Sequence, residues 1–159
     1  MSTCTLRVSG ICFDVKKFLG KSAFDCTDVW EKGEPPIAIP QLTTGIAGAT
    51  NPKIPPCKDS GFLVLLSETE EPNSIEKCVK EAEAFLQAQH ASLLSLCEDS
   101  SVESIELQFA FFSPVGSDFN SPMSKMLFLS KEFLKLVGSF KMSLEVTVYN
   151  SEMLGGADS

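Results

Sequence analysis

Apolar and polar residues alternate along three stretches of the chain, which are residues 3–9, 105–111 and 142–149. Alternation with a period of two is typical of a strand that buries only one of its faces. The polar positions of the first stretch include Arg7, the only arginine, and those of the other two include Glu106 and Glu145. The pattern therefore predicts three strands with one apolar and one polar face each.

Three shorter stretches are also predicted to be strands. Residues 62–66 are apolar at every position, which predicts an interior strand covered on both faces. Residues 26–30 precede the charged turn at residues 31–34, where Gly33 favours a backbone reversal. The apolar run at residues 126–129 predicts a short edge strand.

Capping residues predict two short helices. Asp14 can cap a helix of about two turns, and Gly20 is available to end it in the left-handed conformation. Ser130 can cap a second helix that continues to Gly138. Each short helix therefore begins at a side chain that can accept an amide hydrogen bond and ends at a glycine.

The longest predicted helix runs from a capping box at Asn73 to about Cys97. Its apolar stripe recurs at steps of three and four residues and consists of Ile75, Val79, Ala82, Leu86, His90, Leu93 and Cys97. His90 is the only imidazole in the chain and so the only ordinary general base near neutral pH. Its place within the stripe favours a packed or rim histidine over a catalytic one.

The order of these elements predicts an α+β fold. Its first six elements run strand, helix, strand, strand, helix, strand, as in ferredoxin-like folds, where helices cover one face of an antiparallel sheet. The final helix and strand are predicted to extend that sheet. At 159 residues the chain is long enough for one sizeable core, so we expect a single domain over residues 1–150 and a flexible tail at 151–159.

The segment at residues 35–58 interrupts this pattern because it contains six of the nine prolines. Proline lacks the amide donor that a central strand or a helix interior requires. Long loops inside a compact domain are commonly either functional or disordered. We therefore expect a surface excursion here, either partly ordered or disordered.

The charge of the chain restricts its partners. Its net charge is -8, from 13 Lys and Arg against 21 Asp and Glu, and no basic run is present. This balance disfavours phosphate backbones and anionic membrane surfaces, and no apolar run approaches the length of a bilayer span. A basic protein partner is the electrostatically favoured one, although acidity also serves solubility.

The six cysteines are found at positions 4, 12, 26, 57, 78 and 97. They include no Cys-x-x-Cys pair and have no close histidine, so their spacing does not indicate a zinc site. The chain begins without an apolar signal core. Reduced, mostly buried thiols and a cytoplasmic location fit these features best.

Short motifs scattered over residues 4–150 carry a family resemblance. They are Ser9-Gly10, the turn Trp30-Glu31-Lys32-Gly33, Ser60-Gly61-Phe62, and the helix Leu129-Ser130-x-Glu132-x-Leu134 before a strand that ends in Tyr149. In these motifs the chain resembles the uncharacterised bacterial domain-of-unknown-function family four-two-seven-nine. It departs from the family at Phe62, where tryptophan is expected, and in the length of residues 35–58. The resemblance implies an α+β fold in a bacterial cytoplasm and no established activity.

No stretch of the sequence forms a recognised catalytic, cofactor or metal motif. Carboxylates are grouped at Glu31 and Glu34 and at residues 68–71, but both groups lie in predicted turns, where solvated charge is the usual state. The glycines at 45 and 48 lack the preceding strand and following lysine of a phosphate-binding loop. We therefore assign no catalytic, cofactor-binding or metal-binding residue.

The turn after the only tryptophan is the best candidate for an interaction surface, formed by Trp30, Glu31, Lys32 and Glu34. We expect the Trp30 ring to pack at a strand end and its indole N–H to find a backbone partner. The primary hypothesis is a small, acidic, non-enzymatic binding protein, of which an immunity-type inhibitor of a basic toxin is one form. The alternative is a small-ligand-binding or weakly catalytic domain with a pocket between the sheet and the Pro-rich loop, using His90 or a cysteine. A dimer through exposed edge strands is compatible with either.

Overall fold

The computed structural model describes residues 2–34, 55–69, 75–113 and 127–150. These residues form a five-stranded sheet and four helices, which confirms the α+β class. The elements in chain order are β1 (Ser2–Gly10), α1 (Val15–Leu19), β2 (Asp28–Trp30), β3 (Ser60–Thr69), α2 (Ile75–Ala88), α3 (His90–Glu98), β4 (Ser104–Ser113), α4 (Lys131–Ser139) and β5 (Ser143–Asn150). The Pro-rich residues 35–54 and the predicted tail at 151–159 lie outside the described residues.

The strands lie in the order β2-β3-β1-β4-β5, so the first strand of the chain is at the centre of the sheet. β1 pairs antiparallel with both β3 and β4, and β2 pairs antiparallel with β3. The last pair is different, because β5 runs parallel to β4 from Glu106↔Ser143 to Ser113↔Asn150. The sheet is therefore mixed: the strand that was predicted to extend the antiparallel sheet does extend it, but runs parallel to its neighbour. α4 carries the chain back to the starting end of β4, and a parallel pair requires such a crossover.

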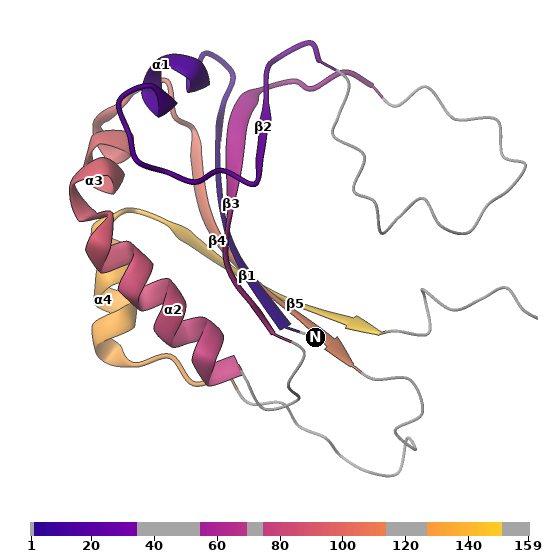
Figure 1. The fold of residues 1–159 in the computed structure, drawn as a ribbon, viewed down its shortest axis with the longest axis vertical. Helices are drawn as coiled ribbons and strands as arrows, with labels where there is room; N and C mark the ends of the chain where they lie inside the picture. Colours follow the sequence, from indigo (N-terminus) through magenta and orange to yellow (C-terminus); the bar gives the residue numbers. More distant parts are fainter. Residues whose placement is uncertain (1, 35–54, 70–74, 114–126, 151–159) are drawn as a thin grey trace, which may run out of the picture.

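All four helices lie on one side of the sheet (Figure 1). The core fills the space between the two layers, with Leu6 and Leu107 at the centre of the sheet and Leu86 and Phe133 from the helices, all fully buried. Around Phe62 the rings of Phe13, Phe18 and Phe24 pack with centroids 5.5 to 6.2 Å apart. Such aromatic contacts add stability beyond simple burial of area.

The long predicted helix is two helices, α2 and α3, separated at Gln89. Gln89 has φ -98° and ψ 17°, so it leaves the helical conformation before the chain resumes a new helix at His90. Beyond this break the buried residues are Leu93 and Leu96, whereas His90 is exposed. The prediction of one continuous apolar stripe was therefore wrong at His90, because the break at Gln89 turns that residue away from the core.

The glycines predicted to end the short helices do not act as left-handed caps. Gly20 is the C-cap of α1 with a right-handed φ of -63°, and Gly138 lies inside α4. The left-handed residue after α4 is Lys141, with φ 52°. The predicted N-caps are confirmed, since Asp14 accepts from the Lys17 amide and Ser130 from the Phe133 amide, each at 3.0 Å.

The predicted strands differ from the observed ones mainly at their ends. β3 is longer than predicted and has a bulge opposite Cys4 and Thr5, while β2 is only three residues long. β3 is interior in the sheet, but the Leu65 side chain is 40% exposed, so its second face is not covered by the described residues. Residues 127–129 form no strand, and residue 126 lies outside the described residues.

Candidate interaction surface on the open face of the sheet

The face of the sheet opposite the helices is polar, as the alternation in β1, β4 and β5 predicted. Cys4, Leu6 and Val8 of β1 are buried toward the helices, so Arg7 lies on the other, open face. The strand registers place Glu106 of β4 and Leu63 of β3 on either side of Arg7. Arg7 thus has a carboxylate on the neighbouring strand and lies on the central strand of the sheet, toward the end where Trp30 packs.

Negative charge predominates on this open face. The strand registers place one carboxylate of each of β2, β3, β4 and β5 on this face, and these are Asp28, Glu68, Glu106 and Glu145. A fifth carboxylate, Asp59, lies just before β3 and beside Trp30. Arg7 is the single cation that the described strands contribute to this face. Counted over the described strands alone, four carboxylates against one guanidinium give this face a formal charge of about -3 at neutral pH.

A hydrogen-bonded network fixes two of these carboxylates. The side-chain amide of Gln108 donates to Glu106 at 3.3 Å and to Glu145 at 2.9 Å, and so links β4 with β5. Ser104 donates a further hydrogen bond to Glu106 at 2.7 Å, and Thr147 donates one to Glu145 at 3.1 Å. Because these donors are neutral, they position the two carboxylates without adding a counter-charge.

Trp30 closes one end of the open face. Its ring lies against Gly61, where an added Cβ would come within 2.5 Å of the ring and 2.2 Å of the Val8 carbonyl oxygen. Its indole N–H donates to the Asp59 carboxylate at 3.1 Å, so the partner is a side chain and not the predicted backbone group. Trp30 is only 9% exposed, which makes it a packing residue at the border of the surface.

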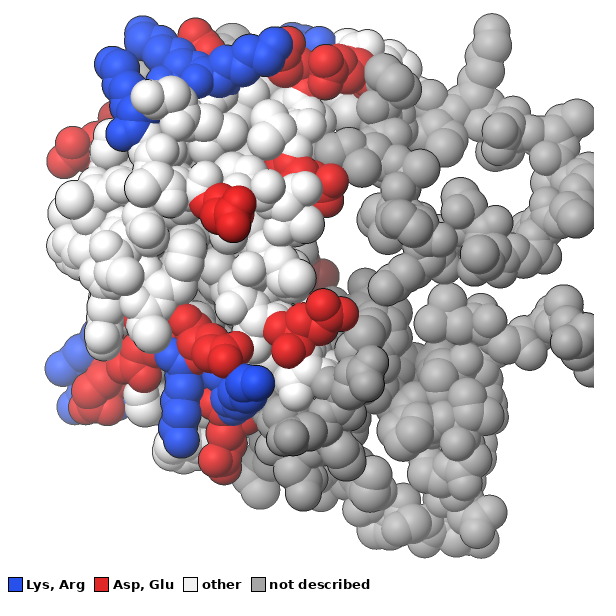
Figure 2. Space-filling model, viewed as in Figure 1, with Lys and Arg blue, Asp and Glu red and all other residues white. Residues whose placement is uncertain are grey.

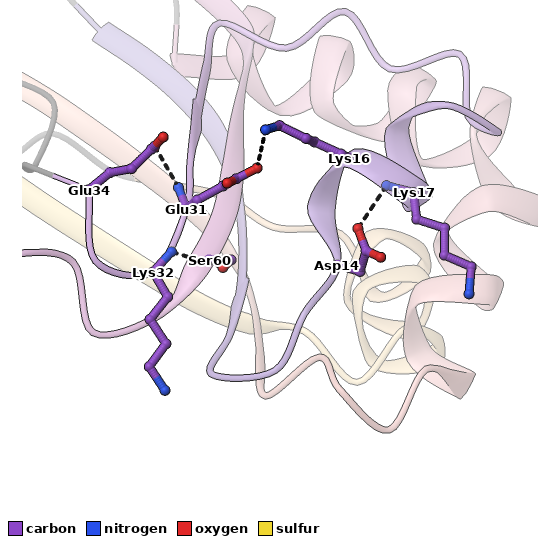
Figure 3. Close-up of polar contacts among 7 residues, drawn as sticks. All are labelled: Asp14, Lys16, Lys17, Glu31, Lys32, Glu34 and Ser60. Carbon is purple, nitrogen blue, oxygen red and sulfur yellow. Dashed lines mark hydrogen bonds and ion pairs between the residues drawn. The ribbon is translucent and has the colours of Figure 1, made fainter.

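The turn after Trp30 is held by backbone hydrogen bonds (Figure 3). The Glu31 amide donates to the Glu34 carboxylate at 2.9 Å, and the Lys32 amide donates to the Ser60 hydroxyl at 3.0 Å. Gly33 has the positive φ of 90° that a reversal needs, and its amide donates to the Cys57 carbonyl oxygen. The predicted reversal at Gly33 is therefore confirmed, and the turn is tied to the segment that leads into β3.

The charge of the turn is more balanced than its own residues indicate. Lys16 of α1 forms an ion pair with Glu31 at 2.6 Å. The hydrogen bond and charge of Glu31 raise the pKa of Lys16. Figure 2 shows lysine and carboxylate side chains side by side at the top of the view, where α1 and the turn lie. The turn therefore offers mixed charge, and the stronger acidic surface is the open face that it borders.

His90 is far from the open face, in the helical layer. Its ring meets the edge of Phe140 with centroids 5.2 Å apart, and the Cys97 thiol donates to the Phe140 carbonyl oxygen at 2.9 Å. His90 and Cys97 stand seven residues apart on α3, a rise of about 10 Å, too far for a direct proton transfer. Burial is the main cause that raises the pKa of Cys97. An exposed ring against the edge of Phe140 corresponds to the rim histidine of the sequence analysis and not to the packed one.

The six cysteines have different environments. Cys4 and Cys78 are buried, Cys12 is exposed, and the other three are intermediate; all six are free thiols. The part of the chain that the structure describes contains no group of three or more potential metal ligands. None of its helices is both long and apolar enough to cross a membrane.

No protein-family model, curated protein or solved structure matches this chain. The resemblance to family four-two-seven-nine therefore stays a prediction. Among the residues of the surface, sequence reasoning had identified Trp30, Glu31, Lys32 and Glu34 and the polar faces of the strands. It did not find Asp59 or Lys16, whose roles depend on contacts between segments distant in sequence.

Proposed function

We propose that this protein is a non-enzymatic binding protein that takes a basic protein partner on the open face of its sheet and the adjoining Trp30 turn. The observation that carries the proposal is the charge of that face, to which the described strands contribute four carboxylates and a single guanidinium, with Asp59 at its border beside Trp30. Opposite charge on a partner accelerates encounter and fixes its orientation.

The arrangement of the carboxylates supports a protein partner. Glu106 and Glu145 lie on adjacent strands and are joined through Gln108, so their positions are set before a partner arrives. Preorganised side chains lose little conformational entropy on binding. Leu65, which is 40% exposed on the same face, and the edge of the Trp30 ring add apolar area beside the charges. Surfaces of protein complexes commonly combine an apolar centre with a charged rim.

An immunity-type inhibitor of a basic toxin in a bacterial cytoplasm is the specific form of this proposal. Such an inhibitor needs fast capture of a cationic partner and no chemistry of its own. For the scaffold, we propose a ferredoxin-like unit made of β1 to β4 with α1 and α2. Its support is the order β2-β3-β1-β4 with antiparallel neighbours, to which the parallel β5 is an addition.

Affinity capture from the native host tests the function. The wild-type protein is expected to retain a stoichiometric basic protein at about 50 mM salt and to release it at about 500 mM, since screening weakens charge attraction between exposed groups. The double variant Glu106→Gln, Glu145→Gln keeps the shape of both side chains and removes two charges from the open face. We expect it to bind the captured partner at least about tenfold more weakly.

A matched control is the double variant Glu76→Gln, Glu98→Gln, which removes two exposed carboxylates from the helical layer. It changes the net charge by the same amount, so its affinity for the partner is expected to stay near wild type. Equal weakening by the two double variants would show that only total charge matters. That result, or the absence of any basic partner at low salt, would refute the proposed surface.

A further inference from the structure

The two edges of the sheet differ in their capacity to pair with another strand. β2 forms one edge and is only three residues long. β5 forms the other edge with eight residues, which include no lysine and no proline. Short strands, lysines and prolines are the usual means by which an edge is protected from pairing. The β5 edge lacks all three of these features.

Apolar side chains are exposed along β5. Val146 is 47% exposed and Val148 is 65% exposed, although the register places them beside the buried Phe109 and Phe111 of β4. Among the described residues, no strand pairs with the outer side of β5. An added strand at this edge would therefore form hydrogen bonds with the outward-facing backbone groups of β5 and cover both valines.

The sequence of β5 is complementary to itself in one antiparallel register. Pairing about Val146 places Val146 opposite its own copy and Leu144 opposite Val148, so each apolar side chain meets another. The same register places Glu145 opposite Thr147 of the second copy, not opposite Glu145. Thr147 already donates a hydrogen bond to Glu145 within one chain, so the two side chains are chemically suited to this pairing.

We propose that the β5 edge is a homodimer interface, in which two copies join their sheets through antiparallel β5 strands about a two-fold axis at Val146. The interface is isologous, because the same strand serves both partners. Both open faces then lie on the same side of one continuous sheet, and both helical layers lie on the other. The proposal is independent of the proposed function and does not require a basic partner.

Electrostatics gives the dimer an unusual salt dependence. Each copy carries a net charge of -8, so the two copies repel one another at low salt. Salt screens that repulsion, and the dimer is expected to strengthen as salt rises. Binding of a basic partner is expected to weaken as salt rises, which is the opposite trend. An experiment can therefore contradict the dimer without contradicting the proposed binding function, and the reverse.

Analytical ultracentrifugation of the full chain at several concentrations tests the interface. The wild-type protein is expected to shift from monomer to dimer between about 5 and about 200 µM in about 0.5 M salt, with a larger dimer fraction than in about 0.05 M salt. Val146→Lys places a buried charge opposite its own copy and is expected to weaken dimerisation at least about tenfold. Val148→Lys is a second variant that is also expected to weaken dimerisation. Urea unfolding verifies that each variant is folded.

Val29→Lys is the matched control, because Val29 is 40% exposed on the opposite edge strand β2. It is expected to dimerise within about twofold of the wild type. A wild-type protein that stays monomeric at every salt concentration would overturn the proposal. So would a dimer that both folded β5 variants leave intact, or one that Val29→Lys weakens equally.

Discussion

The guanidinium carbon of Arg7 lies 5.5 Å from the centroid of the Trp30 ring. The same ring lies against Gly61, and its indole N–H donates to the Asp59 carboxylate. One side chain thus connects β1, β2 and the start of β3 at one end of the open face. The surface near the turn therefore depends on a packed tryptophan, and its rigidity can be tested by substitution.

Replacing Trp30 with phenylalanine should destabilise the protein by roughly 1–3 kcal/mol, because it removes the hydrogen bond to Asp59 and part of the packed ring. Asp59→Asn keeps an oxygen acceptor for the indole N–H and should lower the free energy of unfolding by less than about 1 kcal/mol. Urea unfolding followed by circular dichroism measures both free energies, since Trp30 is the only tryptophan and cannot serve as a common fluorescent probe. An unchanged stability of the Trp30→Phe variant would contradict the packing role.

Gly61→Ala should destabilise the protein by about 1–3 kcal/mol. The added Cβ would lie 2.2 Å from the Val8 carbonyl oxygen, a backbone atom that cannot move without disturbing the β1–β3 pairing. Gly138→Ala is the control, because a Cβ there meets nothing within 4 Å. It should be neutral or stabilising by up to about 1 kcal/mol, since alanine favours a helix. Thermal unfolding should show a lower melting temperature for Gly61→Ala and an unchanged or higher one for Gly138→Ala, and similar losses in both variants would contradict the close approach at Gly61.

Cys4 should make the protein less stable at alkaline pH. Burial, with a smaller contribution from Cys78, raises the pKa of the Cys4 thiol far above its ordinary value of 9.0. The folded state therefore keeps the thiol proton at pH values where the unfolded chain loses it. The stabilising effect is complete below pH 9.0 and is lost progressively above it, by about 1.4 kcal/mol for each pH unit.

Urea unfolding between about pH 8 and about pH 10 measures this dependence. Cys4→Ala should remove about 1 kcal/mol of the alkaline loss of stability, whatever its own effect at neutral pH. Cys12→Ala is the control, because Cys12 is exposed, and its pH dependence should match the wild type. A Cys4→Ala variant with the full alkaline loss would show that other groups cause it.

The sequence predicted the local parts of this structure well. Alternation in β1, β4 and β5 identified their polar faces, because neighbouring side chains of a strand point to opposite sides wherever the strand lies. Ser130 was identified as an N-cap for a similar reason, since its hydrogen bond joins residues only three apart. The break at Gln89 was missed, because the apolar stripe continues across it and no glycine or proline marks it.

What the sequence by itself determined is the α+β class, the polar sides of the strands and the acidic character of the surface. Tertiary structure alone decided that β5 lies parallel to β4, that Arg7 lies over Trp30 and that Lys16 pairs with Glu31. The physical reason is the range of the interactions. Side-chain periodicity and capping act within a few residues, whereas strand order and these contacts join segments far apart in the chain, which only the packing of the whole core brings together.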